Sequence, residues 1–174
     1  METQSKTESA AAQPGQYLTF CLKSQAYGVP IGNVREINRL TDITAVPQTP
    51  FFVAGVMNLR GKVIPVVNLR LKFGLVETEH TRQTCIIVIE GDTGQVGMIV
   101  DSVSGVIDLK AEQIEPAPVL GDSNRLSYVL GMGKVEASVI ILVDIVQALS
   151  KVELMADPAV LEVAAADSQK PAAA

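Results

Sequence analysis

The chain has 174 residues, of which 48% are hydrophobic but only 4% aromatic, and it carries a net charge of −5. This length allows one compact unit or two small lobes, and the acidic balance argues against nucleic acid or an anionic lipid surface as the main partner. Because tryptophan is absent and other aromatic residues are few, the core must be built from Val, Ile and Leu, which favours β-strands.

The two ends of the chain are predicted to be flexible tails. Residues 1–15 and 156–174 contain few large apolar side chains, so burial cannot offset the entropy of ordering them. The N-terminal stretch lacks the apolar segment of a signal peptide. The longest apolar runs, such as 85–89 and 139–143, are too short to cross a bilayer. These features predict a cytoplasmic protein, with its two cysteines as buried free thiols.

The first part of the folded segment has the pattern of a β-hairpin. Apolar and polar residues alternate over 17–22, a turn is expected over 24–26, and a second strand is expected over 27–31. Residues 31–37 are ambiguous, because their apolar positions also suit one face of a helix.

Two further hairpins are expected in the second half of the chain. Strands over 85–90 and 95–101 flank a Gly-Asp-Thr-Gly turn, and strands over 129–135 and 139–144 form the other pair. A short helix through 145–149 is expected to close the folded part.

The sequence also contains an internal echo. Residues 27–31 resemble residues 96–100, and the strand that ends at Asn68 resembles the one that ends at Asp144. Since the two echoes have similar offsets, we expect two strand-rich lobes of like architecture, with an exchange of strands between them left open. Short strands and frequent glycines favour small barrels over a sandwich. The expected lobes cover residues 16–79 and 82–149.

The sequence has no arrangement of residues that is typical of catalysis. The single histidine, His80, lies in a polar stretch without a partner to orient it. There is no cysteine–histidine cluster with metal-ligand spacing, no P-loop and no dinucleotide fingerprint. We therefore expect a protein that is not an enzyme and uses no cofactor or metal. A small hydrolase or transferase, or an oligonucleotide-binding barrel, is the disfavoured alternative.

The segment from Pro47 to Arg70 stands out from the rest. Gly55 permits tight backbone packing, and Asn58 and Gly61 delimit a turn between two strands. Arg60, at the tip of this turn, is either a solvated side chain or an interface anchor, because a guanidinium on a rigid turn beside apolar strands suits binding. The pattern alone leaves both interpretations open.

Several runs, in the same order, resemble the CheW family of chemotaxis coupling proteins. They read VAGVMNLRG followed by VIPVVNLR, YGVPI with VREI, GMIVDSV, and IILVDI. The resemblance implies a mainly β fold of two small five-stranded SH3-like barrels packed together with short helices, over residues 16–150. It also implies a non-catalytic adaptor that couples the cytoplasmic helical hairpin of chemoreceptors (methyl-accepting chemotaxis proteins) to the regulatory domain of the histidine autokinase CheA.

The resemblance further implies roles for single residues. Receptor contact is expected at Ile31, Val34, Glu36, Arg60, Val100 and Val103. Kinase contact is expected, on a looser match, at Thr41, Ile43, Val46, Leu120 and Arg125. Structural positions in and near the turn are expected at Gly55, Asn58 and Gly61. The protein is expected in the cytoplasm, recruited to membrane-associated receptor arrays, in flagellar chemotaxis or in another chemosensory system.

Overall fold

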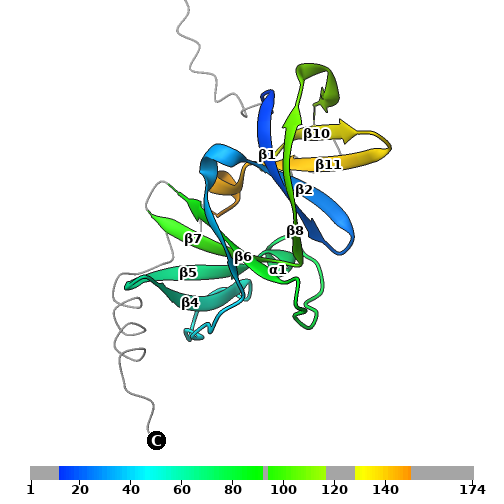
Figure 1. The fold of residues 1–174 in the computed structure, drawn as a ribbon. Helices are drawn as coiled ribbons and strands as arrows, with labels where there is room; N and C mark the ends of the chain where they lie inside the picture. The colour runs from blue at the N-terminus through cyan, green and yellow to red at the C-terminus, as the bar shows by residue number, and fades with distance from the viewer. Residues whose placement is uncertain (1–11, 92–93, 117–127, 150–174) are drawn as a thin grey trace, which may run out of the picture.

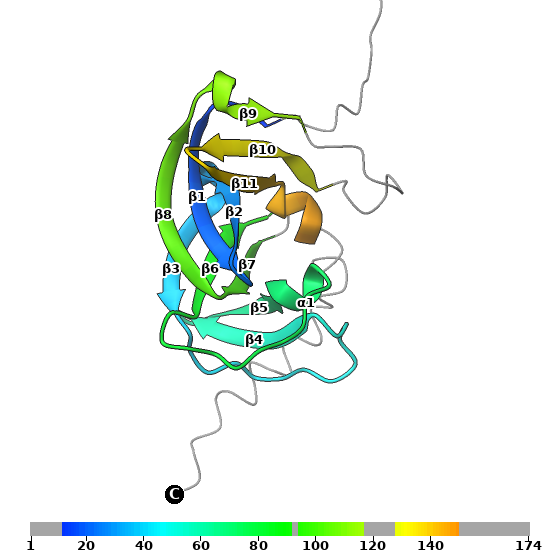
Figure 2. The same ribbon diagram turned by 90° about the vertical axis from the view of Figure 1, so that its right-hand side faces the viewer.

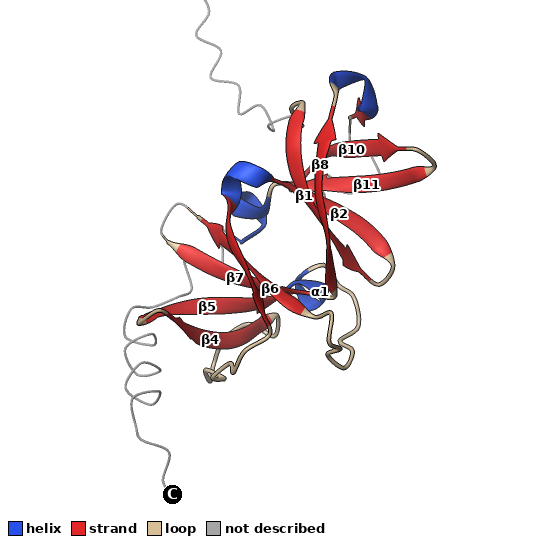
Figure 3. Cartoon of the chain, in the orientation of Figure 1, coloured by secondary structure: helices blue, strands red, loops and turns tan. Residues whose placement is uncertain are grey.

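The structure, a computed structural model, describes residues 12–91, 94–116 and 128–149, and strands dominate these ranges (Figure 3). The strands are β1 Gly15–Leu22, β2 Gln25–Pro30, β3 Val34–Arg39, β4 Val53–Leu59, β5 Lys62–Asn68, β6 Cys85–Glu90, β7 Gln95–Val100, β8 Ser102–Leu109, β9 Ile114–Glu115, β10 Val129–Val135 and β11 Ser138–Val143. The helical elements are α1 Leu69–Lys72, the 3-10 turns η1 Ile31–Asn33 and η2 Ala111–Gln113, and a helical turn over 145–149. The prediction of a mainly β fold is confirmed.

The strands form two sheets that repeat one topology. One sheet has the order β8-β1-β2-β11-β10-β9 and the other β3-β6-β7-β5-β4. Figure 1 shows them as two groups, with β4, β5, β6 and β7 at lower left and β1, β2, β8, β10 and β11 at upper right. When the two strand orders are aligned position by position, β8 corresponds to β3, β1 to β6, β2 to β7, β11 to β5 and β10 to β4. Strand β9 adds a short sixth strand to the first sheet.

This topology corrects the expected lobe boundaries. Each sheet joins the first two strands of one half of the chain to later strands of the other half, so lobes over 16–79 and 82–149 do not match the sheets. The expected tail boundary at residue 15 also needs adjustment. Strand β1 begins at Gly15, and the Ala12 amide donates a 3.2 Å hydrogen bond to the Leu130 carbonyl.

The internal echo has a structural cause at two parallel strand contacts. Gly28 of β2 lies opposite Leu142 of β11, and Gly97 of β7 lies opposite Val66 of β5. A Cβ atom at Gly28 would lie 2.9 Å from Leu142 Cδ2, and one at Gly97 would lie 2.9 Å from Ile86 Cγ2. Glycine therefore lets side chains pack tightly over the strand at the same place in both sheets.

Asn68 and Asp144 cap the helical turns that follow the two corresponding strands. Asn68 Oδ1 accepts a 3.5 Å hydrogen bond from the Leu71 amide, and Asp144 Oδ1 accepts one of 3.1 Å from the Gln147 amide. Asn and Asp are preferred at this position because their side chains satisfy an otherwise unpaired amide. In Figure 2 the two helical turns lie near one another, between the sheets.

The largest hydrophobic cluster lies between the sheets and belongs to both of them. Smaller clusters fill each barrel, one around Val66 and Ile86 and the other around Tyr17 and Leu142. The strands that separate two clusters have both faces buried, which explains their continuous aliphatic runs. The buried members of the central core are Leu18, Phe20, Leu22, Val29, Val67, Leu69, Ile87, Ile89, Val96, Met98, Val100, Val143, Ile145, Ala148 and Leu149.

Besides the central core, a row of four aromatic rings links β1 and β2 of one sheet to the segment after α1, which follows the other sheet. Tyr27 stacks on Phe20 with ring centroids 5.8 Å apart and contacts Phe73, just after α1, at 5.5 Å. Phe73 in turn stacks on Tyr128, before β10, at 5.1 Å. Burial raises the pKa of the Tyr27 and Tyr128 hydroxyls, so these rings are fixed, neutral parts of the packing.

The expected local elements agree with the structure, with small shifts. Both later hairpins are confirmed as the β6–β7 and β10–β11 pairs. The first hairpin turns at Lys23 and Ser24, which have φ of 48° and 65°, rather than over 24–26. The ambiguous residues 31–37 are partly helical and partly strand, since η1 occupies their start and β3 the remainder.

Gly55 should be irreplaceable by alanine. It has φ +146°, and a Cβ atom there would lie 2.1 Å from the Thr44 carbonyl oxygen, which accepts a 2.9 Å hydrogen bond from the Val56 amide. We expect Gly55→Ala to lower the free energy of unfolding by about 2 kcal/mol or more, measured by urea denaturation. Gly32→Ala is the control, because its Cβ atom would meet nothing within 4 Å. Equal stability of both variants would contradict this interpretation.

Candidate functional site

Two of the expected receptor contacts, Glu36 and Arg60, form an ion pair. Arg60 Nη1 donates to Glu36 Oε2 at 2.7 Å, and Asn38 Nδ2 donates to Glu36 Oε1 at 2.7 Å. Hydrogen bonds from Asn38 and Arg60 lower the pKa of the Glu36 carboxyl. Since β3 and β4 are the two ends of their sheet, the pair ties edge strand β3 to the tip of the β4–β5 hairpin.

The turn that carries Arg60 is built by its neighbours. Asn58 Oδ1 accepts a 2.8 Å hydrogen bond from the Gly61 amide, while Arg60 and Gly61 have φ of 52° and 86°. Positive φ at two successive residues gives the tight hairpin turn that matches strand twist. The side chain of Arg60 stays 77% exposed while it pairs with Glu36. The guanidinium is therefore held in place yet open to a partner.

Three aliphatic residues of the expected receptor surface are half-buried against the central core. They are Ile31 of η1, Val34 of β3 and Val103 of β8. Val34 and Val103 lie on corresponding edge strands, one at the end of each sheet. The same two strands carry the exposed side chains of Ile37 (44%) and Val106 (51%). Both sheets thus end in a strand with accessible aliphatic surface.

The expectation for Val100 is wrong. Its side chain is 1% exposed and belongs to the central core, so it does not line an open groove. The reason is strand alternation on β7. Ile99 faces the barrel interior, whereas Met98 and Val100 face the cluster shared by the two sheets.

The expected kinase contacts are only partly described. Thr41, Ile43 and Val46 lie between β3 and β4, where Thr41 is exposed and the other two are half-buried. Ile43 packs against the barrel core, and a bridge between Thr44 and Val56 fixes this stretch. Leu120 and Arg125 lie outside the described residues.

An ion pair that the sequence did not suggest joins α1, which follows β5, to Asp101, which follows the neighbouring strand β7 of the same sheet. Arg70 Nε donates to Asp101 Oδ1 at 2.7 Å, and Arg70 Nη2 contacts Asp101 Oδ2. Asp101 Oδ2 also accepts a 3.0 Å hydrogen bond from the Lys23 amide, and Arg70 Nη1 donates to the Val76 carbonyl. The Arg70 guanidinium is the main cause that lowers the pKa of the Asp101 carboxyl. The available signal was a charged residue close to the end of each of two aliphatic strands, with Arg70 two residues after β5 and Asp101 directly after β7.

The structure gives two further observations on function. Among the described residues, no group of three or more His, Cys, Asp or Glu side chains is placed to hold a metal ion. Within the same ranges, no helix is long and apolar enough to cross a membrane.

Two barrels around a shared core, each with an accessible aliphatic edge strand, define a double-barrel β protein. The family model described as CheW-like domain matches residues 16–153. The chain belongs to the CheW family of chemotaxis scaffold proteins, and each barrel is SH3-like.

Individual relatives support this assignment. The chemotaxis protein CheW of Klebsiella aerogenes is 38% identical over 139 residues, which cover 80% of this chain and 84% of that protein. The chemotaxis protein CheW of Helicobacter pylori is 35% identical over 137 residues, which cover 78% and 82%. The crystal structure of the scaffolding protein TtCheW from Thermoanaerobacter tengcongensis matches with a TM-score of 0.69 and 34% identity, over 76% of this chain and 90% of that chain.

Asp101→Asn should destabilise the protein in a pH-dependent way. It leaves the Arg70 side chain, which is 13% exposed, without a charged partner, so we expect a loss of about 1–2 kcal/mol at pH 7, after allowance for solvent screening of a pair that is not fully buried. Because pairing lowers the pKa of Asp101, its contribution is present above the ordinary value of 3.8 and disappears as the pH falls through the folded-state pKa.

The measurement is urea denaturation of both proteins between pH 3 and pH 7. The control is Glu90→Gln, which breaks the exposed Arg35–Glu90 pair and should leave stability nearly unchanged. A difference between Asp101→Asn and the wild type that stays constant down to pH 3 would rule out the ion pair as its cause.

Proposed function

We propose that this protein is an adaptor that couples chemoreceptor cytoplasmic tips to a CheA-type histidine autokinase, without catalysis of its own. Membership of the CheW family is the observation that carries the proposal. The proposed receptor-facing surface consists of Ile31, Val34, Glu36, Arg60 and Val103. Its aliphatic members are accessible on η1 and the two edge strands, and its charged members form one exposed pair.

The chemistry of this surface suits a helical partner. An amphipathic helix buries its apolar face against aliphatic residues, while charges at the border fix its orientation. Val34 and Val103 supply the aliphatic contact, and the Arg60 guanidinium supplies the charged border. A single contact of this size binds at about the micromolar level, so stable arrays need many such contacts at once.

The kinase-facing surface is proposed at Thr41, Ile43 and Val46. This stretch is anchored to β4 by the Thr44–Val56 bridge and still leaves Thr41 exposed. It lies between β3 and β4, directly after the strand that carries the receptor-facing residues Val34 and Glu36. Contacts for two partners on one protein allow the adaptor to hold kinase and receptor together, in the cytoplasm at a membrane-associated array that serves flagellar or other chemosensory signalling.

Reconstitution tests the adaptor function directly. The protein is mixed with a CheA-type kinase and membranes that contain a chemoreceptor, and kinase autophosphorylation is followed with and without attractant. Control of the kinase by the receptor should appear only when the adaptor is present. Equal receptor control without the adaptor, or none with it, would contradict the proposal.

Arg60→Glu should impair binding to a receptor cytoplasmic fragment far more than folding. The substitution places two carboxylates at the position of the Glu36–Arg60 pair and reverses the charge at the surface border. We expect affinity to fall roughly tenfold and the thermal midpoint to change little, because exposed ion pairs add little stability. Arg35→Glu is the matched control, because it makes the same charge change and breaks the exposed Arg35–Glu90 pair on β3, the strand that carries Glu36. Equal loss of affinity in both variants would count against a specific role for Arg60.

A further inference from the structure

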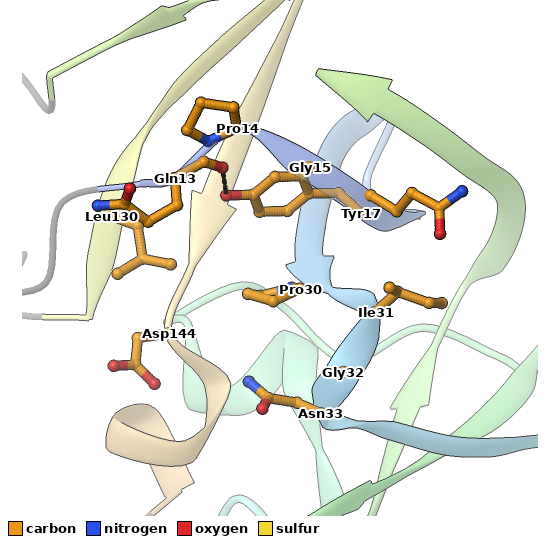
Figure 4. A pocket seen from close by; sticks show the side chains of 11 residues that line it. Gln13, Pro14, Gly15, Tyr17, Pro30, Ile31, Gly32, Asn33, Leu130 and Asp144 are labelled. Carbon is orange, nitrogen blue, oxygen red and sulfur yellow. Dashed lines mark hydrogen bonds between the residues drawn. The ribbon is translucent and has the colours of Figure 1, made fainter. Parts of the chain in front are cut away.

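A cavity of about 370 Å³ lies beside η1, on the barrel formed by the β8-to-β9 sheet (Figure 4). Its walls come from the start of β1, the end of β2 with η1, strand β10, and the residue after β11. Apolar side chains make up much of the wall, and Asp144 supplies its one acidic group. The lining residues are Gln13, Pro14, Gly15, Gln16, Tyr17, Pro30, Ile31, Gly32, Asn33, Leu130 and Asp144.

A second cavity, of about 220 Å³, occupies the corresponding place on the other barrel. It lies at the start of β6, the end of β7 and the cap residue that ends β5. The first cavity likewise lies at the start of β1, the end of β2 and the cap residue after β11. Its corresponding cap residue is Asn68, and Arg70 and Asp101, which pair with each other, both line it. The smaller cavity therefore already has a cation of the chain itself in its wall, paired with Asp101.

The larger cavity lacks this internal cation. By the same correspondence, Val146 stands in place of Arg70 and Gly32 stands in place of Asp101. The carboxylate remaining there is that of Asp144, at the position of the neutral Asn68. Asp144 Oδ1 accepts the Gln147 amide, and Oδ2 accepts no hydrogen bond from the described residues. One oxygen is thus available to a donor from outside.

We propose that this cavity binds a lysine or arginine side chain of the receptor helical hairpin, with the aliphatic stem along Ile31 and Pro30 and the cationic end at Asp144. This inference rests on the proposed function, because Ile31 belongs both to the proposed receptor-facing surface and to the cavity wall. Long basic side chains lay their methylene groups on apolar surface and keep the charge at a polar end. The apolar wall with one carboxylate matches that chemistry.

Asp144→Asn is the central test, because an asparagine already occupies the corresponding position in the other barrel. Asn68 caps the corresponding helical turn, so the substitution removes the charge and keeps the cap. We expect binding to a receptor cytoplasmic fragment to weaken roughly five- to tenfold at low salt. The difference should shrink as salt rises, because salt weakens ion pairs. Calorimetric titration of the full chain between 50 and 300 mM NaCl measures both effects.

Two further variants make the test specific. Gly32→Leu should also weaken binding, because its Cβ atom meets nothing within 4 Å and the side chain can occupy the cavity without disturbing the fold. Glu112→Gln removes one exposed acidic charge that does not line the cavity, so it should bind like the wild type.

The outcomes separate this inference from the proposed function. Normal wild-type binding with an unchanged Asp144→Asn variant would overturn the cation site alone. If Asp144→Asn weakened binding only to the kinase regulatory domain, the cavity would not bind a receptor side chain. Tighter receptor binding after removal of residues 1–11 would likewise contradict a receptor side chain as the occupant. No receptor binding by the wild type would overturn the proposed function and this inference together.

Discussion

The structure depends on a hydrophobic core that belongs to both barrels at once. Leu18 and Phe20 from one sheet and Ile87 and Met98 from the other lie in the same buried cluster. At roughly 25 cal/mol for each Å² of apolar surface removed from water, this burial is the main attraction between the sheets. Neither barrel can move away from the other without exposing it, so the shared core holds the two barrels together as one unit.

That rigidity determines what the surface can do. The accessible aliphatic residues Val34 and Val103 lie on edge strands whose other contacts are fixed by the shared core. The Glu36–Arg60 pair fixes a charge beside one of these strands. At a separate place, Asp101 pairs with Arg70 and also accepts a hydrogen bond from the Lys23 amide of the β1–β2 turn in the other sheet. These residues are therefore held in place by the fold itself, and a surface organised before binding loses less entropy on association.

The sequence predicted the family, the strand content and the later hairpins, because motifs and turn residues are local signals. The echo at Gly28 and Gly97 also predicted two like lobes. It could not say which strand pairs with which, since corresponding strands have similar faces and either partner would satisfy them. Val100 was misassigned for a related reason, because a continuous aliphatic run does not reveal which face is exposed. The Arg70–Asp101 pair depends on the exchanged topology and was invisible without it.

Native-state hydrogen exchange under increasing denaturant can show whether the two barrels share one core. Amides of Val88, in one barrel, and Leu142, in the other, are both fully buried strand positions. With a shared core, both amides should exchange only through the same global opening, with equal free energy and equal dependence on denaturant. Separate openings, with one barrel exchanging while the other stays protected, would contradict it.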